Sequence, residues 1–266
     1  TVRAPDAYRA GEGVDVAQRL ADDIEAAIAD MARHGIKFAG FIADSIFPTY
    51  GLLTTPAGFL KKAIDVVHKH GGVYIADEVQ PGFGRTGSHM WCYQRHGINP
   101  DLVVMGKPMG NGLPIAAVVA RPELLADFGR KVRYFNTFAG NPVCIAAAQA
   151  VLNEIQNKNL MENSHLLGYY LLNGFRVIAE NYTQIGDVRG AGLYHAIEFV
   201  KDPDTKEPDT GLTRKVVSEL RERRILISTT GKGENSLKIR PLLTFNQDNA
   251  DLLLNQFEDT LKAVIR

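Results

Sequence analysis

Apolar residues at helical spacing mark the first element of the chain. Between residues 15 and 34 they fall on one face of a helix, and Gly35 follows them: Val16, Leu20, Ile24, Ile28 and Met31. A second helix is predicted over 56–70, because Pro56 stands at its start and Gly71 and Gly72 at its end. A short helix is expected within 88–97, and a long one over 142–155.

Short apolar runs between these helices are typical of buried strands. They lie at 37–43, 71–77, 101–105 and 114–120. Short strands that alternate with helices predict an α/β fold, in which helices cover both faces of a largely parallel sheet.

The pattern changes after about residue 158. A helix over 160–180 precedes a stretch at strand spacing, 186–200, in which Gly190 and Gly192 mark bends. The polar loop 201–211 follows, and the remaining elements are a helix (211–224), strands (225–228 and 237–240) and a closing helix. The sequence therefore predicts two domains, residues 1–157 and a smaller α+β domain of residues 158–266.

Composition narrows the classes of function. Thirty Lys and Arg residues balance thirty Asp and Glu residues, so charge gives no reason to expect nucleic acid or an anionic membrane as a partner. Only two cysteines are present, which suits a cytoplasmic protein without disulfides. No apolar run approaches the roughly 18 residues of a membrane helix, and no basic and then apolar leader opens the chain. Because the chain begins with Thr1, we expect it to be a piece of a longer protein.

Two glycine-rich stretches suggest nucleotide binding but fail in context. GFGRTG, residues 82–87, matches G-x-G-x-x-G, yet the helical pattern starts only after Gly87 and the next acid, Asp101, begins a strand. GKPMGNG, residues 106–112, has Pro108 where a phosphate loop needs Ser or Thr. The seven histidines are scattered, so a metal site is not expected.

An acid and a lysine follow two of the predicted strands. Asp77 ends one strand and Lys107 comes directly after another, where ligands of open α/β sheets bind. A lysine amine can form a Schiff base with pyridoxal phosphate while a carboxylate holds the pyridine nitrogen protonated. The ordinary alternative is a solvated lysine in a surface loop.

Long stretches around this pair resemble the class III pyridoxal-phosphate aminotransferases of fold type I. They include IADEVQPGFGRTGSHMWCYQRHGINPDLVVMGKPMGNGLPIAAVV (75–119), FIADSIFPTYGLLTTPAGFL upstream, and YFNTFAGNPVCIAAAQAVL, VRGAGLYHAIEFV and LISTTGKGENSLKIRPLL downstream. The resemblance covers nearly the whole chain. It implies the C-terminal part of the cofactor-binding large domain followed by the small domain.

The resemblance also implies roles for five residues. Lys107 would form the Schiff base, Asp77 would pair with the ring nitrogen, and Val79 would pack on the ring face. Gln80 would hydrogen-bond the ring hydroxyl oxygen. Thr137 would reach the cofactor phosphate of the neighbouring subunit, because sites in this family lie at a homodimer interface. The glycines of GFGRTG would then shape a loop beside the site and bind no dinucleotide.

Three departures from the family pattern concern the substrate. Asp44 stands where members usually have Glu. Lys238 stands where many have the Arg that grips the substrate carboxylate, and Arg240, two residues along on the same strand face, is expected to substitute in part. The stretch 228–243 is also closer to the amine-phosphate phospho-lyase branch.

The sequence therefore predicts a pyridoxal-phosphate-dependent aminotransferase that acts on a small amine and a 2-oxo acid. A phospho-lyase acting on an amino-alcohol phosphate, and a non-catalytic dimerisation module, remain alternatives. The resemblance implies over a hundred further residues before Thr1 that carry the phosphate cup. Without them, we expect the 266 residues to bind the cofactor weakly or not at all.

Overall fold

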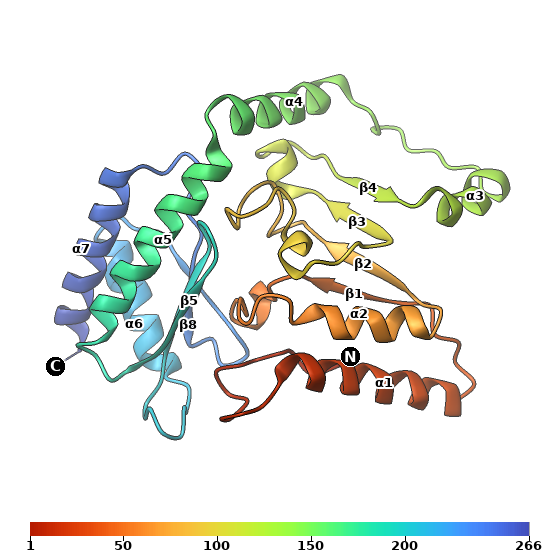
Figure 1. Ribbon diagram of the computed structural model, residues 1–266. Coiled ribbons are helices and arrows are strands. Elements are labelled where there is room, and N and C mark those ends of the chain that lie inside the picture. The colour runs from red at the N-terminus through yellow and green to blue at the C-terminus, as the bar shows by residue number, and fades with distance from the viewer. Residues whose placement is uncertain (266) are drawn as a thin grey trace.

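The computed structural model describes residues 1–265, which form two four-stranded sheets, each with helices packed against one face (Figure 1). The first sheet consists of β1 (Gly40–Asp44), β2 (Val73–Asp77), β3 (Leu102–Met105) and β4 (Ala117–Ala120), in that order. β1, β2 and β3 are parallel, and β4 runs antiparallel to β3. The mainly parallel α/β sheet is thus confirmed, with one antiparallel edge strand.

Two helices cover one face of this sheet, α1 (Val16–Arg33) and α2 (Leu60–Lys69). The Asp15 side chain caps α1 by accepting from the backbone N–H groups of Ala17 and Gln18. Leu20 and Ile24 of α1 pack with Tyr74 of β2 in one buried cluster. α2 begins later than predicted, because Gly58 has a φ of +86° that no helix tolerates.

The opposite face of the first sheet is open. Side chains alternate along β1, so Ala43 is buried against the helices while Ile42 points the other way and is 59% exposed. The expectation that helices cover both faces is therefore wrong for the part of the chain described. The predicted strands at 37–43 and 114–120 also begin three residues before the observed ones. Pro114, at the start of the second run, cannot donate a ladder hydrogen bond.

A helix that the sequence pattern did not indicate follows β4. This helix, α3 (Pro122–Lys131), buries none of its side chains. The chain then returns as a long loop beside the edge of the first sheet to α4 (Pro142–Asn157) (Figure 1). α3 and this loop together form the least covered part of the described chain.

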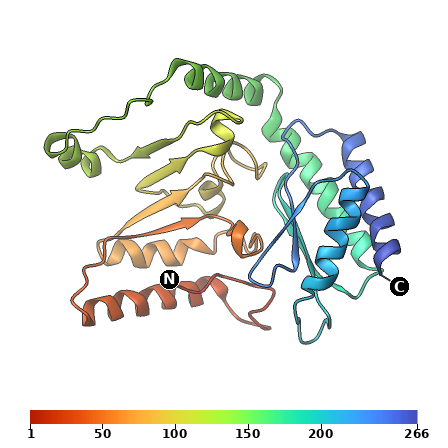
Figure 2. The same cartoon turned by 180° about the vertical axis from the view of Figure 1, so that it is seen from behind.

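The second sheet is antiparallel and has the order β5-β6-β8-β7. Its elements are α5 (Leu160–Ala179), β5 (Ile185–Gly190), β6 (His195–Phe199), α6 (Thr210–Glu222), β7 (Ser228–Thr230), β8 (Ser236–Ile239) and α7 (Gln247–Val264). The three helices lie together on one side of this sheet (Figure 2). β7 starts later than predicted, since Arg224 has a φ of +66° and Leu226 is 85% exposed.

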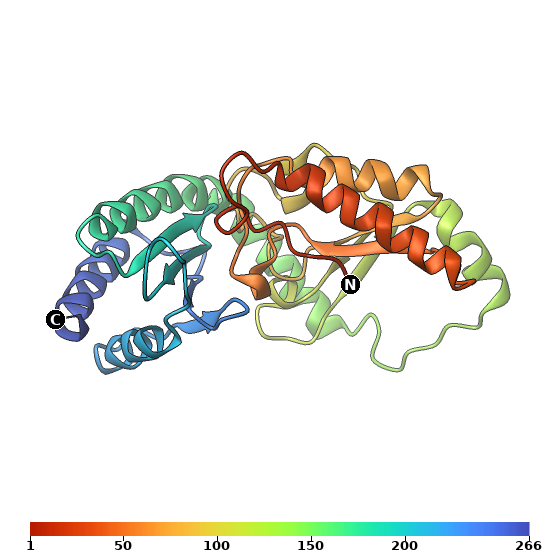
Figure 3. The same ribbon diagram turned by 90° about the horizontal axis from the view of Figure 1, so that it is seen from below.

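The two sheets meet through the GFGRTG loop. A Cβ on Gly192, which has a φ of +52°, would lie 2.5 Å from the carbonyl oxygen of Arg85 and 2.7 Å from the nitrogen of Gly87. Only glycine permits such a close approach of two backbones. The view from below shows the two halves side by side, with this junction between them (Figure 3). The loop is followed by two short 3-10 helices, η2 (Cys92–His96) and η3 (Lys107–Gly110), and not directly by an α-helix that could hold a pyrophosphate. A third 3-10 helix, η1 (Pro48–Tyr50), precedes the loop in the chain.

Within residues 1–265 no helix combines the length and apolar character needed to cross a membrane. The cytoplasmic location stays a prediction.

We expect Phe257→Ala in α7 to lower the free energy of unfolding by about 3–5 kcal/mol, the usual cost of emptying a buried aromatic position. Phe257 is 1% exposed and packs edge-on against Phe175, with ring centroids 5.4 Å apart. Leu252→Ala on the same helix is the control, because Leu252 is 56% exposed and should change the value by less than about 0.5 kcal/mol. Urea denaturation of the complete protein measures both, and equal effects would contradict the described core.

Candidate functional site

The carboxyl ends of β1, β2 and β3 lie at one edge of the first sheet. Asp44 at the end of β1 is in register with Asp77 at the end of β2, so the two acids are neighbours. β3 runs parallel to β2, and after Gly106 its chain continues into η3, which begins with Lys107. Parallel pairing therefore brings the acid and the lysine to the same edge, as expected of a ligand site in this type of sheet.

The backbone at Lys107 is strained. Its φ is +27°, a conformation that costs an ordinary residue about 1–2 kcal/mol and that often marks a functional position. Gly106 before it has no side chain, and a Cβ there would lie 3.8 Å from Cγ1 of Val79. Val79 thus lies next to the start of η3, close to the lysine. Within residues 1–265, the Lys107 amine has no hydrogen-bond or ion-pair partner.

Gln80 joins this edge to the second sheet. Its Oε1 accepts hydrogen bonds from Lys238 Nζ at 3.0 Å, Tyr194 Oη at 3.2 Å and Arg240 Nη1 at 3.3 Å. Lys238 lies on β8 and Arg240 directly follows it, so both side chains reach the same partner, in agreement with their predicted shared face. Gln80 Nε2 donates to no atom of the described residues and is free to donate to a ligand.

Three acids cluster at the edge. Burial raises the pKa of Asp44 to about 8, and the neighbouring charges of Asp77 and Glu78 act in the same direction. Burial also raises the pKa of Glu78 to about 7, although the backbone N–H groups of Cys92 and Tyr93 each donate to its carboxylate at 2.8 Å. Glu78 is fully buried and fixes the start of η2, so its role is structural.

Cations face these acids from the second sheet and from the GFGRTG loop. Burial lowers the pKa of Lys238, and the nearby charges of Arg240 and Lys107 lower it further. Burial, together with Arg240, lowers the pKa of Arg85 to about 10. The Arg85 guanidinium donates only to the carbonyl oxygens of Leu193 and Pro241 and meets no carboxylate of the described residues. An anion entering this region would therefore find positive charge that the chain itself leaves uncompensated.

Thr137 lies apart from the other predicted residues. It belongs to the exposed loop between α3 and α4, and neither a hydrogen bond nor a buried contact ties it to the strand ends. The structure thus brings together Asp77, Val79, Gln80 and Lys107, adds Lys238 and Arg240 through Gln80, and leaves Thr137 outside.

The donor set at the edge fits the ring of pyridoxal phosphate. Asp77 uses Oδ1 to accept from the backbone N–H of Val79 at 3.0 Å, which leaves Oδ2 for a protonated ring nitrogen. Gln80 Nε2 can donate to a ring oxygen, and the Lys107 amine is free. Asp77, Asp44 and Gln80 also line a cavity of about 490 Å³, a size typical of small-molecule sites.

Tyr194 and Arg85 belong to this region but were not identified from the sequence. Tyr194 is fully buried, and the centroid of its ring lies 5.9 Å from Nζ of Lys238 and 5.8 Å from Cζ of Arg240. Such contacts stabilise cations over an aromatic face. Tyr194 is 114 residues from Gln80 along the chain, and no local pattern could reveal the contact.

Comparisons with known proteins show that the chain belongs to the class III aminotransferase family. The sequence profile described as "Aminotransferase class-III" matches residues 1–261. "Alanine--glyoxylate aminotransferase 2-like" of Drosophila melanogaster is 41% identical over 254 residues, which are 95% of this chain and 51% of the relative. "Ethanolamine-phosphate phospho-lyase homolog 1" of Caenorhabditis elegans is 39% identical over 87% of this chain and 50% of its own length.

A solved structure is similar over almost the whole chain. It is an Arthrobacter phospholyase in complex with phosphoethanolamine, 43% identical, with a TM-score of 0.93 over 99% of this chain and 63% of that protein. The chain spans about half the length of the curated relatives it matches.

The raised pKa of Asp44 predicts a pH dependence of stability. The folded chain binds this proton more tightly than the unfolded chain, whose Asp pKa is near 3.8, so Asp44 lowers stability progressively as the pH rises from about 4 to about 8. Asp44→Asn should therefore lose less free energy of unfolding than the unaltered protein between pH 5 and pH 8, as measured with urea.

Asp65→Asn serves as the matched control for this experiment, because Asp65 is exposed on α2. This substitution should leave the pH dependence of the free energy of unfolding as it is in the unaltered protein. An Asp44→Asn protein whose stability falls as steeply as that of the unaltered protein would contradict a raised Asp44 pKa.

Proposed function

Because this chain belongs to the class III aminotransferase family, whose cofactor is pyridoxal 5′-phosphate, we propose that the whole protein is a transaminase. It would move an amino group from a small amine to a 2-oxo acid. The observation that carries this proposal is the position of Asp77 and Lys107 at the ends of adjacent parallel strands, where the cofactor ring would lie between them.

Each residue at the edge would have a defined task. The bound cofactor would supply an electron sink for the carbon that carries the substrate amine. Lys107 would hold the cofactor covalently and, once released, move a proton at its Nζ. Asp77 would keep the ring nitrogen protonated through Oδ2, Val79 would pack on the ring, and Gln80 Nε2 would donate to the ring hydroxyl oxygen. Lys238 and Arg240 would bind the anionic group of the substrate.

We propose that the active protein is a homodimer with shared sites, in which Thr137 contacts the phosphate of the partner's cofactor. The loop that carries Thr137 supports this proposal, because its aromatic residues are unusually exposed. Tyr134 is 67% exposed, Phe135 80% and Phe138 81%. Side chains of this size are seldom left so open unless a partner or another segment covers them. The domain boundary near residue 157 is likewise a proposal, supported by the separate cores of the two sheets.

A specific observation favours a second function, β-elimination of phosphate from an amino-alcohol phosphate. Three cations surround the Gln80–Tyr194 contact: Arg85, Lys238 and Arg240. A phosphate dianion, with two negative charges, balances the positive charge of these three cations better than a carboxylate does. The phospholyase that is 43% identical to this chain supports this second function too.

Borohydride reduction tests the cofactor site. The complete protein, incubated with pyridoxal phosphate and reduced, should carry the added group on Lys107, as peptide mass analysis would show. Lys107→Ala should remove the labelling, whereas Lys232→Ala, a change at an exposed lysine outside this site, should not. Labelling that persists in Lys107→Ala, or falls equally in both variants, would exclude the proposed role of Lys107.

Product analysis separates the two functions. A transaminase should convert bound pyridoxal phosphate to pyridoxamine phosphate when a donor amine is added alone, without releasing phosphate. A phospho-lyase should instead release inorganic phosphate from phosphoethanolamine over many turnovers. In either case Lys238→Gln should raise KM for the anionic substrate about tenfold or more, because a charge-assisted hydrogen bond is lost. An unchanged KM would remove Lys238 from the substrate site.

A further inference from the structure

We propose that a second cavity, separate from the edge that carries Lys107, binds a small phosphorylated compound. The cavity measures about 620 Å³ and lies between the N-terminal segment (residues 2–9), α1 and the loop between β7 and β8. Neither Asp77 nor Lys107 lines it. Its size suits a small molecule rather than a lone water.

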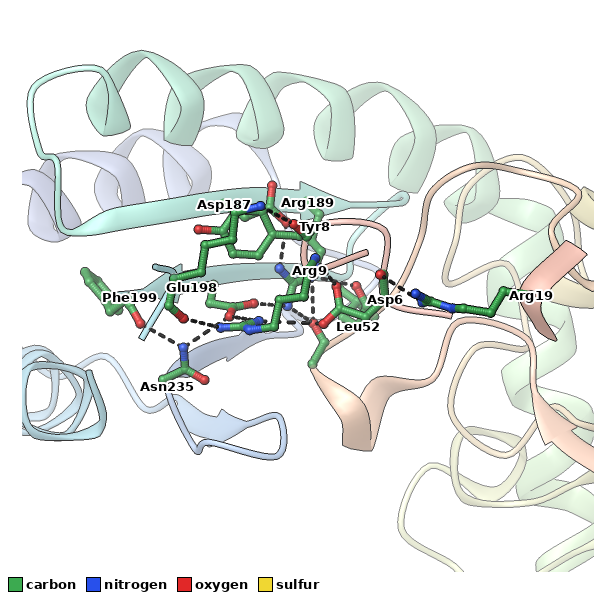
Figure 4. A network of polar contacts seen from close by, with 12 residues as sticks. Asp6, Tyr8, Arg9, Arg19, Leu52, Asp187, Arg189, Glu198, Phe199 and Asn235 are labelled. Atoms are coloured by element: carbon green, nitrogen blue, oxygen red, sulfur yellow. Dashed lines mark hydrogen bonds and ion pairs between the residues drawn. The ribbon is translucent and has the colours of Figure 1, made fainter. Parts of the chain in front are cut away.

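The lining carries more positive than negative charge. Its cations are Arg3, Arg9, Arg19 and Lys232, and its acids are Asp6 and Glu198. Arg3 pairs with Asp23 outside the lining, and Arg9 pairs with both lining acids. Within residues 1–265, Arg19 and Lys232 have no carboxylate partner, and Arg19 reaches only the carbonyl oxygen of Asp6 at 3.5 Å (Figure 4). Two cations therefore remain available for an anion.

The acid deepest in the lining cannot neutralise these two cations, because other groups already hold it. Glu198 is 2% exposed and pairs with Arg189 Nη2 at 2.7 Å, with Arg9, and with Asn235 Nδ2 at 3.2 Å. Arg189 in turn donates to the carbonyl oxygens of Gly51 and Leu52 and pairs with Asp187 (Figure 4). One carboxylate is thus shared by two guanidinium groups and an amide, in a fixed network under the cavity.

Unused hydrogen-bond donors also line the cavity. Ser236 is 1% exposed and its hydroxyl has no partner, which is unusual because a buried polar group without one is costly. The backbone N–H groups of Lys232 and Gly233 make no hydrogen bond to described residues. Ser236, Lys232 and Gly233 all line the cavity, so their donors lie around the same space as the Arg19 guanidinium.

This combination points to phosphate. A guanidinium, an ammonium, a hydroxyl and backbone N–H groups are all donors, and a phosphate group offers several acceptor oxygens with about two negative charges. Arg19 comes from α1 beside the first sheet, whereas Lys232 and Ser236 come from the second sheet. A bound anion would connect the two halves of the chain and stabilise the folded protein, by an amount that grows with the logarithm of the anion concentration above its Kd.

The test is phosphate binding to the complete protein saturated with pyridoxal phosphate, measured by calorimetry at constant ionic strength, with thermal unfolding in parallel. Inorganic phosphate should bind and raise the midpoint of unfolding. The double variant Arg19→Gln/Lys232→Gln should weaken binding about tenfold or more, because each change removes a charged donor. Its unfolding midpoint without phosphate, and the borohydride labelling of Lys107, should stay unchanged and show that the variant folds and keeps the other site.

Two single variants complete the design. Lys215→Gln alters an exposed lysine on α6, and Lys238→Gln alters the proposed substrate site. Lys215→Gln should leave phosphate binding unchanged. Lys238→Gln should still bind one phosphate with unchanged affinity, even where it removes a second phosphate from the substrate site. Equal binding by the double variant, a complete loss of binding in Lys238→Gln, or an absence of phosphate binding to the unaltered protein would overturn the proposal. The phosphate affinities do not depend on whether Lys107 carries the cofactor, so a failure of this proposal and a failure of the proposed role of Lys107 can be told apart.

Discussion

The contact between the GFGRTG loop and Gly192 is the constraint on which the arrangement of the site depends. Two backbones approach there so closely that any side chain on Gly192 would overlap with the loop. The contact fixes the second sheet against the strand ends of the first. Tyr194 comes two residues after Gly192 and reaches Gln80, and Lys238 and Arg240 reach the same amide from β8. The loop that first suggests a nucleotide site is therefore the joint between the two sheets.

Charge is unevenly distributed across that joint. Acids gather at the strand ends of the first sheet, where burial and neighbouring negative charge raise the pKa of Asp44 and of Glu78. Cations gather on the second sheet and in the GFGRTG loop, where burial and mutual repulsion lower the pKa of Lys238 and of Arg85. A region built in this way holds unfavourable electrostatic energy that a charged ligand relieves. Shifted pKa values of this kind are common at functional sites.

The sequence predicted most elements and the acid–lysine edge, because both depend on local patterns. Asp77 and Lys107 each follow an apolar run, and parallel strands must end at the same edge. α3 was not predicted, although it begins with Pro122, a common first residue of a helix. The exposed face of the first sheet around Ile42 contradicts the expectation that helices cover both faces. Burial patterns in a sequence indicate that a surface is covered but not which segment covers it.

Contacts across long sequence distances were beyond prediction for a different reason. Tyr194 contacts Gln80, and Arg85 contacts Leu193, across the junction between the two halves of the chain. No spacing of residues in the sequence indicates these contacts. The paired positions of Lys238 and Arg240 could be predicted, since residues two apart on a strand share a face. Their common partner, Gln80, could not be predicted from spacing.

The use of an amide rather than a carboxylate at position 80 has a consequence for ligand exchange. Oxygen Oε1 of Gln80 orients Lys238 and Arg240 but brings no negative charge to them. A hydrogen bond from a cation to a neutral oxygen lacks the Coulomb attraction that an ionised acceptor adds. A glutamate here would hold both cations in ion pairs and compete with any incoming anion. Gln80 instead orients Lys238 and Arg240 through hydrogen bonds to its neutral oxygen. An anionic ligand can replace that oxygen as their acceptor without first breaking an ion pair.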